Sequence, residues 1–549
     1  MTLSTTVSQY LIRRLLEYGV EHVFGVPGDY FLNFCRQLEE SPLQFINTSD
    51  EQGAGFAADA YARLRGMGVV CVTYCVGGLK LANTTAQAYA EKSPVVVISG
   101  APGLNERLRD PLLHHKVRDF ATQLRIFREL TAAATDLTDV DNGCCEIDRV
   151  LDTAWRCKRP VYIELPRDLT ECSCQTPCRP RLQPAAGDGA QLAEALDEIQ
   201  NRLSRARRPV ILAGIEVQRY GLQEALLDLL KRTGLPFATT LLAKSVLPED
   251  HPQFIGLYEG ALGAERVRQQ IEDSDCLLLL GAFLTDINLG IFTARLDPSR
   301  TIYATSERTT VGHHAYPEVY LPDLLDSLRK AKLTVPPIPA ATQRPAAAPW
   351  AVSEKPITIA RLMFCLESFL AADTVLLADP GEALFAAADL TIRHPGAFLA
   401  PAYYTSMGFA VPGAIGAQLA RPDLRPVVLV GDGAFQMTGM ELATAARFGL
   451  TPIVIVLNNC GYSTERPMLD GAFNDIPAWR FSRLPEFLGS GRSFDIHTES
   501  QLEAALKQAM EDQSTWALLE IHLHPDDRSP ALQRLTEALA KRVRGRDQA

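Results

Sequence analysis

Oxygen-bearing residues follow two neighbouring apolar runs in the last third of this 549-residue chain. Asp432 comes directly after residues 427–430, and Asn459 follows residues 453–457 and precedes Gly461. A carboxylate, an amide oxygen and a main-chain carbonyl are hard donors that suit Mg²⁺ or Ca²⁺, and a magnesium ion with few protein ligands usually adds phosphate oxygens and water. Gly-Asp-Gly alone is typical of a tight turn, but the Asn-Asn that follows at strand–helix–strand spacing favours a metal site.

Five side chains that could transfer protons stand in four other motifs: Asp29 in GVPGDY, Glu51 in SDEQGAGFAADAYAR, His114 and His115 in LLHH, and Glu465 in GYSTE. Histidine has an unperturbed pKa of about 6.5 and can transfer protons near neutral pH. The motifs also have ordinary explanations. An Asp after Pro-Gly commonly forms a turn, a Glu at a helix start offsets the helix dipole, and a His pair is commonly a surface or core feature. Local spacing alone does not decide between these functions.

Alternating strand-like and helix-like segments would position these residues. Apolar runs cover residues 69–74, 95–99, 161–165, 210–213, 277–280, 375–378, 427–430 and 453–457. Strands that alternate with amphipathic helices predict an α/β fold of three doubly wound parallel-sheet domains, with helices on both faces of each sheet. A crossover helix is expected over residues 437–448. Both oxygen-bearing loops then emerge at carboxyl ends of strands, where open α/β sheets bind ligands.

Two composition breaks divide the chain into domains. Residues 172–189 have no periodicity and residues 335–355 are rich in Pro and Ala, so both are expected to be surface linkers. A chain of this length has room for three or four domains. The predicted domains are residues 1–180, 190–335 and 355–545.

Composition narrows the classes of partner and the location. The net charge of −11 and the pI of about 5.5 argue against nucleic acid or an anionic membrane as the main partner. The first residues are polar and no apolar run approaches the roughly 18 residues that span a bilayer, so the cytoplasm is the expected location. The twelve cysteines are expected to be mostly buried thiols. Cys172, Cys174 and Cys178 lack a second ligand pair and are not expected to bind zinc.

Residues 431–462 resemble the diphosphate–magnesium signature of thiamine diphosphate enzymes, and the resemblance extends over nearly the full chain. It implies that Asp432, Asn459 and the carbonyl of Gly461 hold Mg²⁺, while Gly433 and Ala434 lie against the diphosphate. It also implies an N-terminal pyrimidine-binding domain, a central domain without direct cofactor chemistry and a C-terminal diphosphate-binding domain.

The remaining motifs are similar to those of the 2-oxo acid decarboxylases, which include the pyruvate, indolepyruvate and phenylpyruvate enzymes. The acetolactate synthase and benzoylformate decarboxylase branches lack the pair His114 and His115 at this place. The implied reaction is non-oxidative decarboxylation of a 2-oxo acid to an aldehyde and CO₂ through a thiamine diphosphate C2 ylid. In this family Glu51 would hydrogen-bond the aminopyrimidine ring and activate C2, and Asp29 would act with the two histidines during aldehyde release.

Two further segments complete the implied site. Residues 403–412 are similar to the segment that bends the cofactor into a V, with Met407 between its rings and the Thr405 carbonyl accepting from its amine, although a Met commonly fills a core. Glu465 is expected to have a raised pKa beside the diphosphate and Asp29, and to assist decarboxylation and the following protonation. Arg466 would oppose this shift unless its side chain turns away, as we expect.

Substrate size is inferred from four positions. Ile287 and Leu384 stand where pyruvate-specific relatives carry large aromatic residues, and Thr464 and Met468 are expected to line the same space. Smaller walls favour phenylpyruvate, indolepyruvate or a long or branched aliphatic 2-oxo acid over pyruvate. A pyruvate-specific decarboxylase, an acetolactate synthase-like carboligase and a non-enzymatic nucleotide-binding protein are the open alternatives.

The resemblance also implies an assembly. In this family the pyrimidine domain of one subunit faces the diphosphate domain of another, so Glu51 and Asp432 would meet across a dimer interface. A homo-oligomer is therefore expected, with a dimer of dimers as the usual form. Lys80 departs from the family pattern, because a small or neutral residue usually follows this Gly-rich turn. Its side chain is expected either to be solvated or to influence substrate charge.

Overall fold

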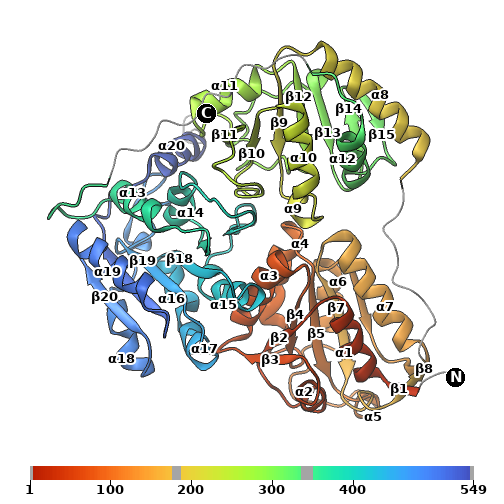
Figure 1. Ribbon diagram of the computed structural model, residues 1–549. Coiled ribbons are helices and arrows are strands. Elements are labelled where there is room, and N and C mark those ends of the chain that lie inside the picture. The colour runs from red at the N-terminus through yellow and green to blue at the C-terminus, as the bar shows by residue number, and fades with distance from the viewer. Residues whose placement is uncertain (1–3, 176–186, 336–349, 545–549) are drawn as a thin grey trace.

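The computed structural model describes residues 4–175, 187–335 and 350–544, which form three α/β domains (Figure 1). The first domain has six parallel strands in the order β3 (Gln44–Asn47), β2 (His22–Gly25), β4 (Gly68–Val72), β5 (Val95–Ala101), β7 (Val161–Pro166) and β6 (Ala133–Asp136). Its helices are α1 (Val7–Glu17), α2 (Leu32–Glu39), α3 (Glu51–Arg65), α4 (Ala82–Ala90), α5 (Leu104–Arg107), α6 (Thr122–Leu130) and α7 (Val140–Cys157).

Both faces of this first sheet are buried. Along β4, Val69 and Cys71 enter a core with α1, α2 and α7, while Val70 and Val72 enter the core that contains α3. Successive strand residues point to opposite faces, so an uninterrupted apolar run fits a strand covered by helices on both sides. This explains why the apolar runs in the sequence located the strands.

The central domain has a seven-stranded sheet. Its order is β11 (Phe254–Leu257), β10 (Phe237–Thr239), β9 (Pro209–Ala213), β12 (Cys276–Leu280), β13 (Thr301–Ala304), β14 (Thr309–Val311) and β15 (His314–Tyr316). Its helices are α8 (Gly189–Arg205), α9 (Glu216–Arg219), α10 (Gln223–Thr233), α11 (Glu265–Glu272) and α12 (Leu321–Lys330). The strands up to β13 pair in parallel, whereas β14 and β15 pair antiparallel, so this sheet is mixed at one edge.

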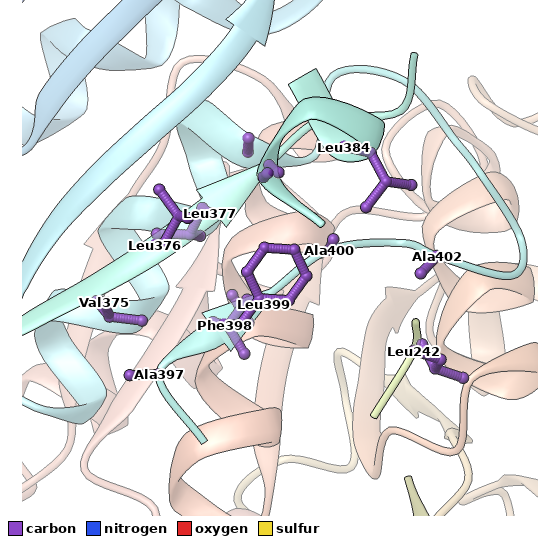
Figure 2. Close-up of a cluster of buried hydrophobic side chains, with 14 of the residues drawn as sticks. Leu242, Val375, Leu376, Leu377, Leu384, Ala397, Phe398, Leu399, Ala400 and Ala402 are labelled. Atoms are coloured by element: carbon purple, nitrogen blue, oxygen red, sulfur yellow. The ribbon is translucent and has the colours of Figure 1, made fainter. Parts of the chain in front are cut away.

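The third domain repeats the parallel six-stranded plan. Its order is β17 (Phe398–Leu399), β16 (Thr374–Ala378), β18 (Arg425–Gly431), β19 (Ile453–Asn458), β21 (Ala517–His522) and β20 (Arg492–Ile496). Its helices are α13 (Ile359–Phe369), α14 (Glu382–Ala387), α15 (Ala410–Ala420), α16 (Asp432–Thr438), α17 (Leu442–Arg447), α18 (Leu484–Leu488), α19 (Glu499–Glu511) and α20 (Pro530–Arg544). Figure 2 shows buried side chains of β16 and β17, together with Leu384 of α14 and Leu242 of the central domain.

The predicted three-domain α/β class is confirmed, and each predicted apolar run coincides with a strand to within two residues. The predicted crossover helix over residues 437–448 is confirmed in part: α17 lies within it, but its start and its continuity are wrong. The helical segment begins at once with Asp432, and a 3₁₀ turn, Gly439–Glu441, separates α16 from α17. The domain boundaries stay predictions.

The predicted linkers and the state of the cysteines also differ from expectation. The predicted linker 172–189 begins with a strand, β8 (Ser173–Gln175), which pairs antiparallel with β1 (Ser4–Thr6); residues 176–186, including Cys178, lie outside the described residues. Residues 336–349 of the second predicted linker also lie outside them. Cys144 of α7 and Cys174 of β8 form a disulfide, so the expectation of thiols is wrong for this pair, and Cys174 is not a free metal ligand. Among the described residues, no helix combines the length and apolarity needed to cross a membrane.

The first and third domains are joined by close packing of α3 against α15 (Figure 1). Both helices are rich in Gly and Ala, so their backbones approach closely. A Cβ atom at Gly416 of α15 would lie 1.9 Å from the main-chain oxygen of Ala57 in α3. This contact fixes Glu51, the first residue of α3, relative to the segment that precedes α15.

Gly416→Ala should lower the stability of the folded chain by about 1–3 kcal/mol, because the added methyl meets a main-chain oxygen that cannot move aside. The matched control is Gly143→Ala in α7, where the nearest atom to a new Cβ lies 3.9 Å away. The control should raise stability by about 0.5–1 kcal/mol, as an added Ala does within a helix. Thermal unfolding followed by circular dichroism measures both. A melting temperature for Gly416→Ala at or above that of the wild type would contradict the account of α3 and α15.

Candidate active site

A cavity of about 310 Å³ lies at the carboxyl ends of β18 and β19, between the third domain and a loop of the central domain. Eleven of the residues singled out from the sequence line it: Ile287, Leu384, Thr405, Met407, Asp432, Gly433, Ala434, Asn459, Gly461, Thr464 and Glu465. Met468 is not in the lining. A second cavity, of about 380 Å³, lies between Lys244, Glu259 and Arg534, but none of the predicted residues line it. The first cavity is therefore the candidate site.

Asp432 follows the carboxyl end of β18 and is the first residue of α16. It is 2% exposed, and its two carboxylate oxygens accept hydrogen bonds from the main-chain N–H of Gly433 at 2.8 Å and of Asn459 at 3.1 Å. Burial raises the pKa of Asp432 to about 6, against the lowering effect of the surrounding main-chain N–H groups. A buried carboxylate without a cation is costly, so this environment favours a bound metal ion.

The donors around Asp432 fit a magnesium–diphosphate group. The Oδ1 atom of Asn459 is buried and has no hydrogen-bond partner among the described residues. An orphaned amide oxygen beside a buried carboxylate is an arrangement that a hard cation would satisfy. Gly433 also lines the cavity, and the Tyr462 ring packs so closely on it that a Cβ there would lie 2.6 Å from the ring.

The segment before α15 is held from two domains. Thr405 has a φ of 57°, a left-handed conformation that is costly for a side chain with a branched Cβ, and both Thr405 and Met407 face the cavity. Buried Asp379 accepts hydrogen bonds from the N–H of Gly408 at 2.7 Å and of Ala410 at 2.8 Å. Burial raises the pKa of Asp379 to about 7. The strained backbone is thus fixed by a carboxylate on the strand side.

Glu91, from the first domain, holds the other end of this segment. Its carboxylate accepts hydrogen bonds from the N–H groups of Tyr403 and Tyr404, at 2.8 and 2.9 Å, and pairs with Arg63 at 2.8 Å. The main-chain oxygen of Glu91 accepts from Arg219 of the central domain. All three domains therefore meet at one buried group of charges beside the cavity.

The first domain assembles a second cluster from Asp29, His114 and His115. Nε2 of His114 lies 2.8 Å from Oδ2 of Asp29, and the rings of His114 and His115 are 4.7 Å apart. Tyr30 stacks on His114 at 4.8 Å and donates from its hydroxyl to the His114 main-chain oxygen. The sequence prediction that these three residues act together gains a geometric basis.

Glu51 begins α3 and is held by its neighbours. Asp50 caps the helix by accepting from the N–H of Gln52, and Glu441 of the third domain accepts from the N–H groups of Ser49 and Asp50 at 3.1 and 2.9 Å. Lys80 Nζ lies 2.8 Å from Oε2 of Glu51. The Lys80 side chain is 49% exposed and therefore partly solvated, but its ammonium also pairs with Glu51 and Asp50, a contact that the sequence did not predict.

Glu465 reaches the cavity from the segment after β19. Burial raises the pKa of its carboxyl, although the residue lies at the surface of the single chain. Arg466 turns away as expected, with its guanidinium 3.0 Å from Asp470 and 2.6 Å from Asp475. The neighbouring cation therefore does not oppose the raised pKa. The direction of the shift is the one expected, and its cause within the chain is burial.

The cavity contains only part of the predicted site. Asp29, Glu51, His114 and His115 are absent from its lining and lie in the first domain. The structure thus brings the residues predicted to bind the metal and the diphosphate, and all the predicted substrate-pocket residues except Met468, to one cavity, whereas the proton-transfer residues predicted in the first domain lie elsewhere.

No sequence motif pointed to several of the residues that line the cavity. Asp286, Ile291, Glu382 and Phe385 come from the central loop and α14, and Leu535 and Leu539 come from α20 near the end of the chain. Burial raises the pKa of Glu382 to about 7, and its Oε2 atom lacks a hydrogen-bond partner among the described residues. The short motif GEALF resembles an ordinary helix start, and α20 is an ordinary amphipathic helix. Only the tertiary structure places either beside Asp432.

Comparison with family models assigns every domain. Residues 5–122 match the N-terminal TPP binding domain of thiamine pyrophosphate enzymes, residues 196–324 match their central domain, and residues 379–521 match their C-terminal TPP binding domain. The matched C-terminal range contains Asp379, Asp432 and Glu465. The two cofactor-binding domains are therefore the two that carry the separate halves of the site.

Curated relatives cover almost the whole chain. An indole-3-pyruvate decarboxylase of Azospirillum brasilense is 37% identical over 524 residues, which is 94% of each chain. An alpha-keto-acid decarboxylase of Mycolicibacterium paratuberculosis is 35% identical over 94% of each chain. An alpha-keto-acid decarboxylase of Mycobacterium ulcerans is 34% identical over 97% of this chain and 96% of its own. With the buried oxygen cluster and the histidine pair in place, this identity over the full length shows that the chain belongs to the thiamine diphosphate-dependent 2-oxo acid decarboxylases.

Proposed function

We propose that the enzyme converts bulky 2-oxo acids, aromatic, long-chain or branched, to aldehydes and CO₂ in preference to pyruvate. The observation that carries this proposal is the wall of the cavity. Ile287, Leu384 and Thr464 line the space that faces Asp432 and Glu465, and two of them are aliphatic rather than aromatic. The relative named for indole-3-pyruvate agrees with a larger substrate.

The residues of the third domain would hold the cofactor. Asp432, Asn459 and the Gly461 carbonyl would bind Mg²⁺, and Gly433 and Ala434 would lie against the diphosphate. Thiamine diphosphate supplies the carbon nucleophile and the electron sink for decarboxylation when it is bound. Thr405 and Met407 would orient its two rings, because both side chains sit on the strained segment that Asp379 and Glu91 hold in place.

Proton transfer would fall to side chains from both domains. Glu465, whose pKa is raised by burial, can be protonated nearer to neutral pH and donate to the reacting carbon. Its acid function would be lost as the pH rises through that raised pKa. The pair of Asp29 and His114, 2.8 Å apart, can carry a proton during aldehyde release, with His115 next to it.

A second copy of the chain would complete the site. The first domain exposes apolar side chains around its cluster, including Leu112 at 96% and Val117 at 60%, and the third domain exposes Phe473 at 66% and Met437 at 49%. Apolar faces of this kind are typical of subunit interfaces. A dimer that pairs first domain with third domain would bring Glu51 to Asp432, and a dimer of dimers is the proposed form. The proposed location stays the cytoplasm.

The alternative activities differ in what they require. A carboligase of the acetolactate synthase type would use the same cofactor, but the assembled pair of Asp29 and His114 favours aldehyde release. A pyruvate-specific decarboxylase would require a narrower wall at Ile287 and Leu384.

Aldehyde formation from pyruvate, 2-oxoisovalerate, phenylpyruvate and indolepyruvate tests the proposal. With thiamine diphosphate and Mg²⁺ present, the bulky acids should give the higher kcat/KM. Ile287→Phe should narrow the wall and shift the ratio of phenylpyruvate to pyruvate turnover towards pyruvate by about tenfold, the scale of a pocket change of a few methylenes. Met468→Phe is the control and should leave the ratio unchanged, because Met468 is outside the lining. Activity confined to pyruvate in the wild type would overturn the substrate assignment.

Asp432→Asn should weaken thiamine diphosphate binding by about 100-fold or more, since even a supporting partner of a metal ligand is commonly worth 10- to 100-fold. Calorimetric titration with and without Mg²⁺ measures the loss, and chelation of Mg²⁺ should produce it in the wild type. Asp423→Asn, which removes a surface partner of Arg421, is the control and should bind as the wild type does. Equal affinity with and without metal would rule out the metal site.

A further inference from the structure

Lys80 contacts the carboxylate that activates the cofactor in this family. It lies in the 3₁₀ turn Gly78–Leu81, after the Gly-rich turn that ends β4. Its Nζ atom lies 2.8 Å from Oε2 of Glu51 and also pairs with Asp50. One ammonium is therefore shared by two successive carboxylates at the start of α3.

The two oxygens of Glu51 have different surroundings. Oε2 accepts from Lys80, whereas Oε1 lies beside Gly77, where even a Cβ would come within 3.2 Å. Within residues 4–175, 187–335 and 350–544, no hydrogen-bond donor reaches Oε1. The Glu51 side chain is only 13% exposed, so few directions of approach to this oxygen remain.

The main chain around Glu51 is held in place, so the contact with Lys80 determines the orientation of the Glu51 side chain. Glu441 fixes the N–H groups of Ser49 and Asp50, and a Cβ at Gly53 would lie 2.1 Å from Oε1 of Glu441. Glu51 follows these residues directly, so its backbone has little freedom. The orientation of its carboxyl group depends on what holds Oε2, and in this chain that is Lys80.

Lys80 stays charged in this setting. Hydrogen bonds to Asp50 and Glu51 raise the pKa of its ammonium. The side chain is 49% exposed, so the stability that the ion pairs contribute is small. The main effect of the contact is to orient the Glu51 carboxylate, since a charge-assisted hydrogen bond fixes the direction of a carboxylate.

We propose that Lys80 is a positioning residue that holds Oε2 of Glu51 so that Oε1 faces the ring nitrogen of the cofactor's aminopyrimidine. The proposal rests on the role proposed for Glu51. It gives a function to a lysine that stands where this family usually has a small or neutral side chain. Lys80 itself would touch neither the substrate nor the reacting carbon.

Lys80→Met in the full-length enzyme tests this assignment through the bound cofactor. Calorimetry should show three- to tenfold weaker thiamine diphosphate binding with Mg²⁺ present, and the near-ultraviolet circular dichroism band of the activated aminopyrimidine tautomer should weaken. Lys80→Arg should recover most of both signals, because it keeps the cation. Lys507→Met, at an exposed position on α19, is the matched control and should change neither signal. An unchanged melting temperature shows that the fold is intact.

A double variant shows whether Lys80 acts through Glu51. In a Glu51→Gln background, Lys80→Met should cause no further loss of affinity, because coupled residues do not add. An equal further loss would overturn the proposal, and so would a raised KM for the 2-oxo acid with an unchanged cofactor signal, which would place Lys80 at the substrate. If Glu51→Gln alone binds and activates the cofactor as the wild type does, the role of Glu51 fails, and this outcome is visible before Lys80 is changed.

Discussion

The packing of α3 against α15 is the contact on which the rest of the site depends. Glu51 begins α3, and the strained segment with Thr405 and Met407 leads into α15. Because Gly416 meets the main-chain oxygen of Ala57 without a side chain between them, the two helices behave as one rigid body. Two domains that are far apart in sequence are thereby fixed to each other within one chain, and in the proposed dimer Glu51 and the segment with Thr405 and Met407 would each serve a different one of the two sites.

Buried carboxylates then set the local geometry. Asp379 and Glu91 accept from main-chain N–H groups on either side of the segment 403–410, and Glu441 does the same for the residues before Glu51. Main-chain donors are fixed in direction, so each carboxylate orders a loop that would otherwise be free. Asp432 differs because its neighbour Asn459 keeps an unpaired buried oxygen. That difference separates a structural carboxylate from one suited to a metal ion.

Features encoded by local sequence could be predicted. The strands follow from apolar runs, because parallel strands are covered on both faces, and the meeting of Asp432, Asn459 and Gly461 at one cavity follows from their positions after β18 and β19. The start of α3 at Glu51 and the outward turn of Arg466 agree with expectation. Contacts between distant residues could not be derived in this way. Three examples are the ion pair of Lys80 with Glu51, the hydrogen bond from Tyr403 to Glu91 and the position of Leu535 in the cavity wall. They depend on how the chain packs in three dimensions. The early start of α16 at Asp432 shows that a Gly-Asp-Gly motif can belong to the helix as well as to a turn.

The central claim is that one complete site needs two copies of the chain. Mixing Glu51→Gln enzyme with Asp432→Asn enzyme under conditions that exchange subunits tests it, with aldehyde formation as the measurement. Each variant alone should be nearly inactive. If the halves of the site come from different chains, mixed dimers regain one intact site of two, and random exchange restores about a quarter of wild-type activity. No recovery despite demonstrated exchange would contradict the account, because it would place Glu51 and Asp432 of the same chain in one site.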